Sequence, residues 1–573
     1  MTSNRWWREP EVGLLAVLVL AIFGSRLHAL PLRGEEPRRA RIAVEMIESG
    51  DWIVPRQQGQ PFLSRPPLQN WVIGLLGLAR GHVNTVAIRL PSMLAILCMT
   101  LLIYGYARGF MSRVGATASA AAYATAGHVL ELGRLGETES LFTLFVGGSL
   151  LAWHWAPARG GRTRWGWIIA YVFVALGTLT KGPQAPIYFA LSVGVYLLVT
   201  ARWRDALTLW HLAGVVIFAG LLALWLVPFW RMQGWAGTAK IFGYDVGLRF
   251  DDTRGLTLLK HLASYPFEVL GCLLPWSALL VAYVRRDFRA LLKANKINGG
   301  AAALFLVIAV AVTFPTCWLT PGAKTRYFMP LYPCFAILSG IVIERCSQAD
   351  AAVPLRSIWR WFLWVMAAVM CAVGAGTVIG RLDGPWPLAA GYATAVAVLV
   401  AAALWAAFQV ARPERAWQAS SLNSPIHHAR PTLRVGARGS ATQIAIVSVA
   451  TFVGLTWTTA VLNVQLRTAN DTTAPAVAAL REGLPPGTHL ASFSWVDPLF
   501  AYYYRAPIRY VPWPTSGETI DPAITYFCYG NDSPLPGPVT VDYDEVARIS
   551  CDRNQGKPDH RVVIVGKRKE PAR

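Results

Sequence analysis

Two adjacent carboxylates, Glu35 and Glu36, stand in the sequence RGEEPRRARIAVEMI, directly after the first long apolar run of the chain. A carboxylate held at a membrane surface can deprotonate an incoming hydroxyl group, or it can orient a cationic or metal-bound group. The simpler interpretation is a pair of solvated surface charges. The following IAVEMI has helical spacing, so this segment is expected to lie along the membrane interface and to fix the loop.

Five cations that could bind phosphate occur in four separate segments. They are Arg65 in LSRPPLQ, Lys181 in LTKGP, Arg249 in VGLRF, and Lys324 and Arg326 in GAKTRYFMP. Each alone fits an interfacial residue whose charged end reaches water. Arginine offers phosphate oxygens a planar fork, and lysine offers them a point charge. Together these cations therefore suit a phosphate- or pyrophosphate-linked lipid.

Glu139 and Tyr327 are further candidates for a binding cavity. Glu139, in GETESLFTLF, begins an apolar run, where a carboxylate also stabilises a helix N-terminus, and Glu137 competes for that role. Tyr327 also fits an aromatic residue at a membrane interface. No HExxH, P-loop or dinucleotide fingerprint occurs in the sequence. No nucleotide cofactor is therefore expected, whereas the sequence leaves open whether a divalent metal ion binds.

These groups have to be positioned by helices that cross a membrane. Hydrophobic residues make up 54% of the 573-residue chain, which contains 24 tryptophans, and the mean hydropathy is +0.39. A bilayer core about 30 Å thick needs ~20 apolar residues per helix, and about thirteen runs approach that length. They begin near Glu11, Asn84, Ala116, Ser140, Trp165, Gln184, Leu209, Pro266, Gly299, Arg326, Trp359, Pro387 and Thr442. The expected fold class is a polytopic α-helical membrane protein.

The charges of the links between these runs predict the orientation. If the N-terminus with Arg5 and Arg8 is cytoplasmic, the inside links, such as PARGGRTRW and VRRDFRALLKANK, are rich in arginine and lysine, as expected. The outside links hold most of the acidic residues and all the candidates above. Basic inside links also account for the net charge of +21 without nucleic acid, for which no binding motif is present.

Two domains are predicted. Residues 1–465 form the transmembrane domain, with an interfacial first outside loop at 32–83, and residues 466–573 form a small extracytoplasmic α/β domain. The second domain is indicated by β-type runs such as THLASFSW, IRYVPW and RVVIVG, separated by Pro, Gly and Asp. Its two cysteines, Cys528 and Cys551, could form a disulfide in an oxidising compartment, and this pairing is left open.

The ordered motifs resemble those of the lipid A 4-amino-4-deoxy-L-arabinose transferases and related bacterial undecaprenyl-phosphate-dependent enzymes of the protein O-mannosyltransferase-like superfamily. This family has an Asp-Glu pair, Arg-Tyr-Ala, Gly-Asp-Trp and Lys-Pro-Pro in its first outside loop, and further motifs later in the chain. The matching residues here are Glu35-Glu36, Arg38-Arg39-Ala40, Gly50-Asp51-Trp52, Arg65-Pro66-Pro67, Glu139, Thr180-Lys181-Gly182, Arg249-Phe250, Lys324, Tyr327 and Pro330. Three residues depart from the pattern: Glu35 replaces Asp, Arg39 replaces Tyr and Arg65 replaces Lys.

The resemblance implies a GT-C fold and an inverting glycosyltransferase of the bacterial inner membrane. It would move a sugar from a polyprenyl-phosphate carrier to a lipid A, glycan or protein acceptor. By the same resemblance, Arg65 and Arg249 bind the carrier phosphate and Lys181, Glu139 and Tyr327 line the cavity, while Glu35 or Glu36 acts as the base.

Two other classes of function remain open at this stage. A transporter or flippase for a phosphorylated lipid would use the same cations, but it needs a polar path across the midplane, where the apolar runs hold almost no acids. An interaction protein would bind its partner through the domain from about Leu466 onward.

Overall fold

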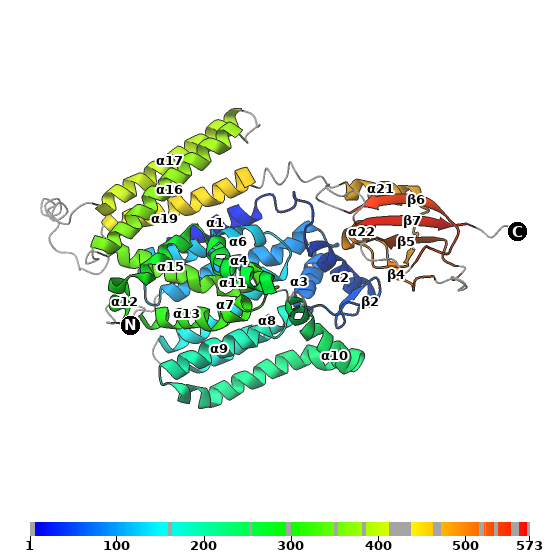
Figure 1. Ribbon diagram of the computed structural model, residues 1–573, viewed down its shortest axis with the longest axis horizontal. Helices are drawn as coiled ribbons and strands as arrows, with labels where there is room; N and C mark the ends of the chain where they lie inside the picture. Colours follow the sequence, from blue (N-terminus) through cyan, green and yellow to red (C-terminus); the bar gives the residue numbers. More distant parts are fainter. Residues whose placement is uncertain are drawn as a thin grey trace.

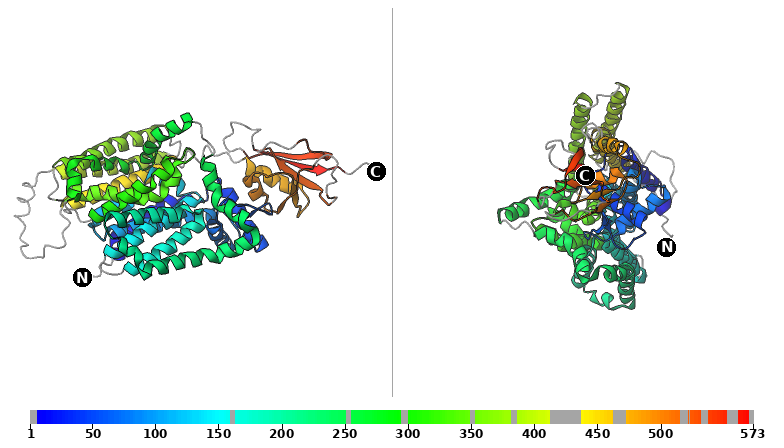
Figure 2. Two further views of the ribbon diagram at one scale, coloured as in Figure 1. Left: turned by 60° about the horizontal axis from the view of Figure 1, so that its bottom comes forward. Right: turned by 90° about the vertical axis from the view of Figure 1, so that its right-hand side faces the viewer.

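The structure is a computed structural model. It describes residues 6–158, 163–250, 255–293, 300–348, 353–380, 386–411, 437–461, 472–514, 521, 523–531, 537–551 and 561–569. Within these ranges some helix ends, including residues 244–250, are described by their backbone alone. The chain forms a bundle of helices and a smaller domain built on a β-sheet, which lies beyond one end of the bundle (Figure 1, Figure 2).

The bundle contains most of the helices of the chain. They are α1 (Pro10–Val19), α4 (Thr85–Ala107), α5 (Arg113–Ala124), α6 (Gly127–Leu132), α7 (Thr138–Ala158), α8 (Thr163–Lys181), α9 (Gln184–Val199), α10 (Leu209–Phe250), α11 (Gly255–Cys272), α12 (Arg286–Lys293), α13 (Gly300–Thr313), α14 (Pro315–Trp318), α15 (Tyr332–Ser347), α16 (Val353–Gly380), α17 (Trp386–Ala411) and α19 (Ala437–Thr456). Short 3-10 helices include η4 (Trp276–Val284) and η5 (Thr325–Leu331).

Seven helical segments among the described residues are long and apolar enough to cross a membrane. They are Thr85–Ala107, Leu209–Gly243, Gly300–Trp318, Thr325–Ser347, Arg356–Gly376, Ala390–Val410 and Gly439–Thr459. Each corresponds to a predicted span, which confirms a polytopic helical membrane protein. The full count of about thirteen stays a prediction, because other apolar helices, such as α9 with 16 residues, are shorter.

One predicted span is not a continuous helix that begins where it was expected. The run expected to begin near Pro266 is not a single helix, because Pro266 lies inside α11, which ends at Cys272, and the chain continues as η4 from Trp276. Pro275 stands between them, and a proline offers no N–H to continue the helical ladder.

Small residues allow the central helices to pack closely. In α5, eleven of the twelve residues are buried, and six of the twelve are alanine. A Cβ atom on Gly340 of α15 would collide with the Ser119 side chain and would lie 2.8 Å from the carbonyl oxygen of Gly115. Close backbone approach of this kind is how membrane helices gain packing energy in place of a hydrophobic driving force.

The first outside loop is folded into three elements at the sheet-domain end of the bundle (Figure 1). They are α2 (Glu36–Ser49), a hairpin of β1 (Arg56–Gln57) and β2 (Gln60–Pro61), and α3 (Leu68–Ala79). The predicted helix at IAVEMI is confirmed as part of α2, whereas α3 was not predicted. At 12 residues, α3 is too short for the length rule that identifies spans.

The Gly50-Asp51-Trp52 motif has a structural role at the end of α2. Gly50 adopts a left-handed conformation (φ +72°), the usual C-terminal stop of a helix. The Asp51 carboxylate accepts hydrogen bonds from the backbone N–H groups of Ile53 (3.0 Å) and Val54 (3.1 Å). The Trp52 carbonyl accepts a hydrogen bond from the indole N–H of Trp71 in α3 (2.6 Å). The motif therefore ties α2 to α3.

The smaller domain is a mixed five-stranded sheet with helices on one face. Its elements are α21 (Thr473–Gly483), β3 (Leu490–Ser492), α22 (Pro498–Tyr504), β4 (Ile508–Tyr510), β5 (Tyr526–Gly530), β6 (Tyr543–Ser550) and β7 (Val562–Arg568). The strand order is β4-β3-β5-β7-β6, in which β3 is parallel to β4 and β5, and β7 is antiparallel to β5 and β6. Cys528 and Cys551 are buried free thiols in this structure.

The sheet domain is joined to the first outside loop by specific contacts. The Gln58 side chain accepts a hydrogen bond from the Val496 N–H (3.1 Å) and donates one to the Ser494 carbonyl (3.3 Å). The N–H of Tyr510 donates to the carbonyl oxygen of Gln58 (3.2 Å). Leu499 of α22 is buried in the cluster that contains Ala43 of α2. The loop is therefore held between the bundle and the sheet.

Candidate active site at one end of the bundle

Glu36 belongs to a buried network of hydrogen bonds at this end of the bundle. Its carboxylate, which is fully buried, accepts two hydrogen bonds from the Arg89 guanidinium, at 2.8 and 2.9 Å. It also accepts the backbone N–H groups of Gly136 (2.8 Å) and Arg33 (2.8 Å). Arg89 donates its remaining hydrogen bonds to carbonyl groups of residues 27–31. Both charges are thus paired and satisfied, and the pair joins the segment before α2 to α4 and to Gly136.

We expect Glu36→Gln to destabilise the protein by about 3–5 kcal/mol, because it leaves a buried guanidinium without its counter-charge. The thermal unfolding midpoint of the purified protein in detergent checks this. The double variant Glu36→Met with Arg89→Met serves as the control, since apolar replacement of both members of a buried pair is far less costly. A double variant no more stable than Glu36→Gln would contradict this account of the pair.

Glu35, the neighbouring residue, faces a different environment. Its side chain is 33% exposed and pairs with Arg38, one turn further along α2. Its backbone N–H donates a hydrogen bond to the Glu137 carboxylate (3.3 Å). Burial would raise the pKa of Glu35, but Arg38, Arg39 and Arg65 outweigh it and lower the pKa below the ordinary value. Glu35 is therefore an ionised carboxylate with one side open to a ligand.

Gly34 makes the contact with Glu137 possible. It has a positive φ of +57°, and a Cβ atom there would lie 2.4 Å from Oε1 of Glu137. We expect Gly34→Ala to displace that carboxylate. The expected result is a large loss of transfer activity with only a small fall in the unfolding midpoint. Gly59→Ala is the matched control, because Gly59 also has a positive φ (+75°) but has open space around its Cβ position. Equal losses of activity and of the unfolding midpoint in both variants would argue against a specific role for Gly34.

Two arginines lie deeper in the site. Arg39 is 2% exposed, and its Nε atom has no hydrogen-bond partner among the described residues. Burial and the charge of Arg65 lower the pKa of Arg39 to about 10, with Glu35 opposing the shift, so it is still protonated at neutral pH. Arg65, which is 9% exposed, donates a hydrogen bond to the Thr138 hydroxyl at the start of α7 (3.2 Å). These two buried guanidinium groups give this side of the site its positive charge.

The opposite side of the site comes from α7, α8 and η5. Lys181, the last residue of α8, pairs with Glu139 at 3.0 Å, and its ammonium group lies 4.8 Å from the ring centre of Tyr327. Arg326 lies 3.5 Å from Glu137 and 3.8 Å from Glu139. Burial and the neighbouring Glu139 raise the pKa of Glu137, although Arg326 opposes the shift.

The structure brings most of the predicted site residues together. Contacts and charge interactions join Glu35, Arg65, Glu139, Lys181, Arg326 and Tyr327. Glu36 lies beside them, within its own ion pair. Lys324 is exposed, and no ion pair found among the described residues includes it. Arg249 lies in the part of α10 whose side chains are outside the described residues.

Two arginines of the site or its support were not among the candidates. Arg39 was noted only as a departure from the family motif, although its position four residues after Glu35 in a helix was a usable signal. Arg89 lies within the apolar run after Asn84, and a single arginine in such a run is itself a sign of a buried partner. Both signals were present in the sequence.

The carboxylates of the site are held by cations. Among the described residues, no group of three or more His, Cys, Asp or Glu side chains is arranged to hold a metal ion. Glu35 contacts Arg38, and Glu137 and Glu139 contact Arg326 and Lys181. A divalent cation would have to displace these groups.

Comparison with solved structures identifies the class of protein that this fold defines. The crystal structure of ArnT from Cupriavidus metallidurans bound to undecaprenyl phosphate aligns over 98% of this chain and 98% of its own, with a TM-score of 0.66 and 18% identity. The apo structure of that protein aligns over 97% of each chain, with a TM-score of 0.67 and 19% identity. The chain therefore has the GT-C fold.

Sequence comparison then shows which proteins the chain resembles. Residues 64–228 match the family model described as dolichyl-phosphate-mannose-protein mannosyltransferase. The undecaprenyl phosphate-alpha-4-amino-4-deoxy-L-arabinose arabinosyl transferase 2 of Sodalis glossinidius is 25% identical over 399 residues, which cover 66% of this chain and 66% of that protein. The corresponding transferase of Pseudomonas aeruginosa strain LESB58 is 28% identical over 356 residues, covering 59% and 61%.

These matches confirm the resemblance expected from the motifs. The chain spans just under two thirds of the length of the curated relatives that it matches.

Proposed function

We propose that the protein is an inverting glycosyltransferase that moves a sugar from a polyprenyl-phosphate carrier to an extracytoplasmic lipid A, glycan or protein acceptor. Lipid A aminoarabinose-type transfer is the leading specific reaction. The observation that carries the proposal is the grouping of cations from three predicted outside links: Arg38, Arg39 and Arg65 surround the open carboxylate of Glu35, and Lys181 and Arg326 surround that of Glu139. Support comes from the relatives named as undecaprenyl-phosphate-dependent transferases and from the GT-C fold.

In this mechanism, Arg65 and Arg39 hold the carrier phosphate, with Arg249 as a further candidate. The bond between the anomeric carbon and the phosphate oxygen breaks, and its electron pair stays on the phosphate. Preorganised guanidinium groups stabilise the charge that develops there. The acceptor oxygen attacks the opposite face of the sugar, and its proton moves to the carboxylate of Glu35.

Glu36 is a positioning residue in this proposal, because its carboxylate already accepts four hydrogen bonds. Lys181 and Arg326 hold Glu139 in place, and the Tyr327 ring packs against the Lys181 ammonium group. If the acceptor is a phosphate that is already ionised, Glu35 needs to remove no proton, and it orients the acceptor instead.

The proposal includes a location and a topology. The protein would lie in the bacterial inner membrane with about thirteen spans, a cytoplasmic N-terminus and a periplasmic C-terminal domain. The alternation of basic and mixed links supports this orientation, since basic links favour the cytoplasmic side.

The test is transfer of radiolabel from undecaprenyl-phosphate sugars, supplied one at a time, to a cell-envelope extract by the purified protein. Label that moves to a lipid or protein band would support the proposal and name both substrates. No transfer from any carrier by folded protein would overturn it and favour a flippase.

A further inference from the structure

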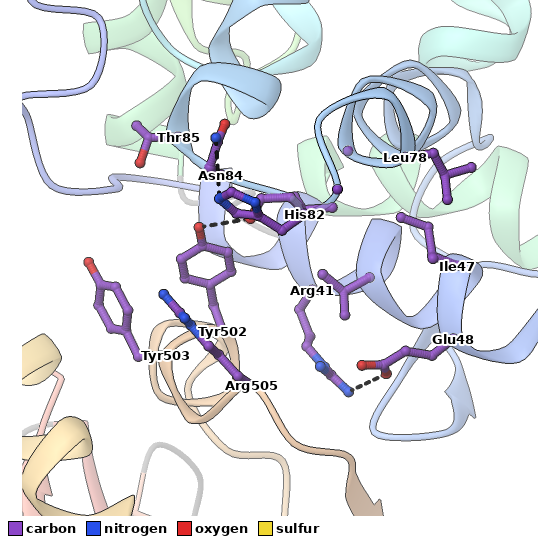
Figure 3. A pocket seen from close by; sticks show the side chains of 14 residues that line it. Arg41, Ile47, Glu48, Leu78, His82, Asn84, Thr85, Tyr502, Tyr503 and Arg505 are labelled. Atoms are coloured by element: carbon purple, nitrogen blue, oxygen red, sulfur yellow. Dashed lines mark hydrogen bonds and ion pairs between the residues drawn. The ribbon is translucent and has the colours of Figure 1, made fainter.

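A cavity whose lining includes none of Glu35, Arg39 and Arg65 lies against α2. It has a volume of about 630 Å³ and is lined by α2, by the turn between α3 and α4, and by α22 of the sheet domain. Figure 3 shows side chains from all three walls, with Glu48 on α2 and with Tyr502 of α22 extending toward His82. Nothing in the proposed reaction uses this cavity.

The walls of this cavity are held in place. The Tyr502 hydroxyl donates a hydrogen bond to the carbonyl oxygen of Val83 (3.2 Å), which fastens α22 to the turn before α4. Asn84 caps the N-terminus of α4 by accepting the Ala87 N–H at 2.9 Å. These contacts fix the walls of the cavity, so little binding free energy is lost in ordering them.

Arg505 is the cation that α22 contributes to the cavity. It ends α22 with a φ of +63°, a left-handed conformation in which glycine is the usual residue. An arginine at such a position costs roughly 1–2 kcal/mol. Its side chain is exposed, extends past the Tyr502 ring toward Tyr503, and belongs to no ion pair within the described part of the chain (Figure 3). Arg41, the other arginine of the cavity, is already paired with Glu45 and Glu48.

The other lining groups suit a sugar. The Tyr502 and Tyr503 rings lie 5.4 Å apart at an angle of 58°, and such rings cover the apolar faces of sugar rings. His82 and Asn84, 3.4 Å apart, offer planar polar groups for hydroxyls.

The cavity also adjoins a helix of membrane length. Thr85, on its wall, begins the membrane-length helix α4. Leu78 of α3, which lines it, is 53% exposed, and Leu75 on the same helix is 60% exposed. An apolar wall that continues into an exposed leucine surface beside a span is suited to the chain of a lipid.

We propose that this cavity binds the phosphate-bearing sugar head group of a membrane glycolipid, with Arg505 on the phosphate and the two tyrosines on the sugar. This inference rests on the proposed function, because it makes that glycolipid the acceptor. Arg41 lies on α2 about 9 Å along the helix axis from Glu35, so one acceptor head group can extend from the cavity toward the open carboxylate.

The experiment measures lipid binding to the full-length protein in detergent by native mass spectrometry. The probes are lipid A, lipid A with both phosphates removed, and phosphatidylglycerol. The variants are Arg505→Gly, which keeps the left-handed conformation without strain, and Tyr503→Ala. Arg481→Ala removes an exposed cation of the same domain outside the cavity and serves as the control.

Arg505→Gly is expected to weaken lipid A binding about tenfold and to leave binding of the dephosphorylated form unchanged. Tyr503→Ala should weaken the binding of lipid A and of its dephosphorylated form, and Arg481→Ala should weaken the binding of neither lipid. Unchanged lipid A affinity in Arg505→Gly would overturn the inference, as would phosphatidylglycerol binding as tightly as lipid A, since charge alone would then suffice.

Transfer assays with the same variants separate this inference from the proposed function. A raised KM for lipid A in Arg505→Gly, with an unchanged KM for the donor, supports both. Transfer to lipid A that does not depend on Arg505 overturns the cavity inference alone. Lipid A binding that depends on Arg505 in a protein that transfers no sugar supports the cavity and overturns the catalytic proposal.

Discussion

Arg65→Ala should lower kcat for sugar transfer by about 100- to 1000-fold, the usual loss when one preorganised group that stabilises a developing negative charge is removed. Arg65 is suited to this role because it is almost completely buried and lies just before α3, where the following Pro66 and Pro67 limit its backbone. The measurement is single-turnover transfer from a saturating undecaprenyl-phosphate sugar, so that a change in donor affinity does not mask the chemical step.

Two variants show whether this loss comes from charge or from shape. Arg65→Lys keeps the charge that the family motif has at this position, and we expect it to recover most of the rate. Arg285→Ala removes an exposed cation from a predicted inside link and should leave transfer unchanged. If Arg65→Ala retained full activity, the carrier phosphate would have to be held elsewhere, with Arg39 and Arg249 the remaining candidates.

The one-sided grouping of the site was predictable from the sequence because link charges follow the membrane orientation. Glu139, Lys181 and Arg326 are separated by many residues, yet the alternation of inside and outside links places them at one membrane face. Their direct contacts confirm that they lie together. The same reasoning could not show which of the predicted outside residues take part in the ion pairs of the site. Lys324, two residues before Arg326, is exposed and apart from the ion pairs of the site.

The different roles of Glu35 and Glu36 could not be derived from the sequence. Adjacent residues at the start of a helix point about 100° apart, so the two glutamates were expected to face different surroundings. The residue that faces inward depends on Arg89, which is 53 positions further along the chain and belongs to a span. A tertiary partner at that separation leaves no local signal at the glutamates themselves.

Glu35→Gln should reduce transfer to a hydroxyl acceptor by about 10²- to 10⁴-fold, the contribution of a positioned general base. The amide keeps the size of the side chain but cannot take the proton. Carrier binding should persist, because Arg65 and Arg39 are unchanged. Transfer and binding of undecaprenyl phosphate, measured on the same preparation, check this. Full transfer activity would remove the base role and favour an acceptor that is already ionised.

The pH dependence of kcat/KM provides an independent test of this role. A base acts in its deprotonated form, so activity falls as the pH drops through the pKa of Glu35. Arg38, Arg39 and Arg65 lower that pKa, and the acid limb should therefore lie below the ordinary glutamate value of about 4.3. Arg38→Gln removes the nearest cation and should shift the acid limb toward higher pH. A limb that does not move in Arg38→Gln would assign it to another group, because Arg38 is the direct ion-pair partner of Glu35.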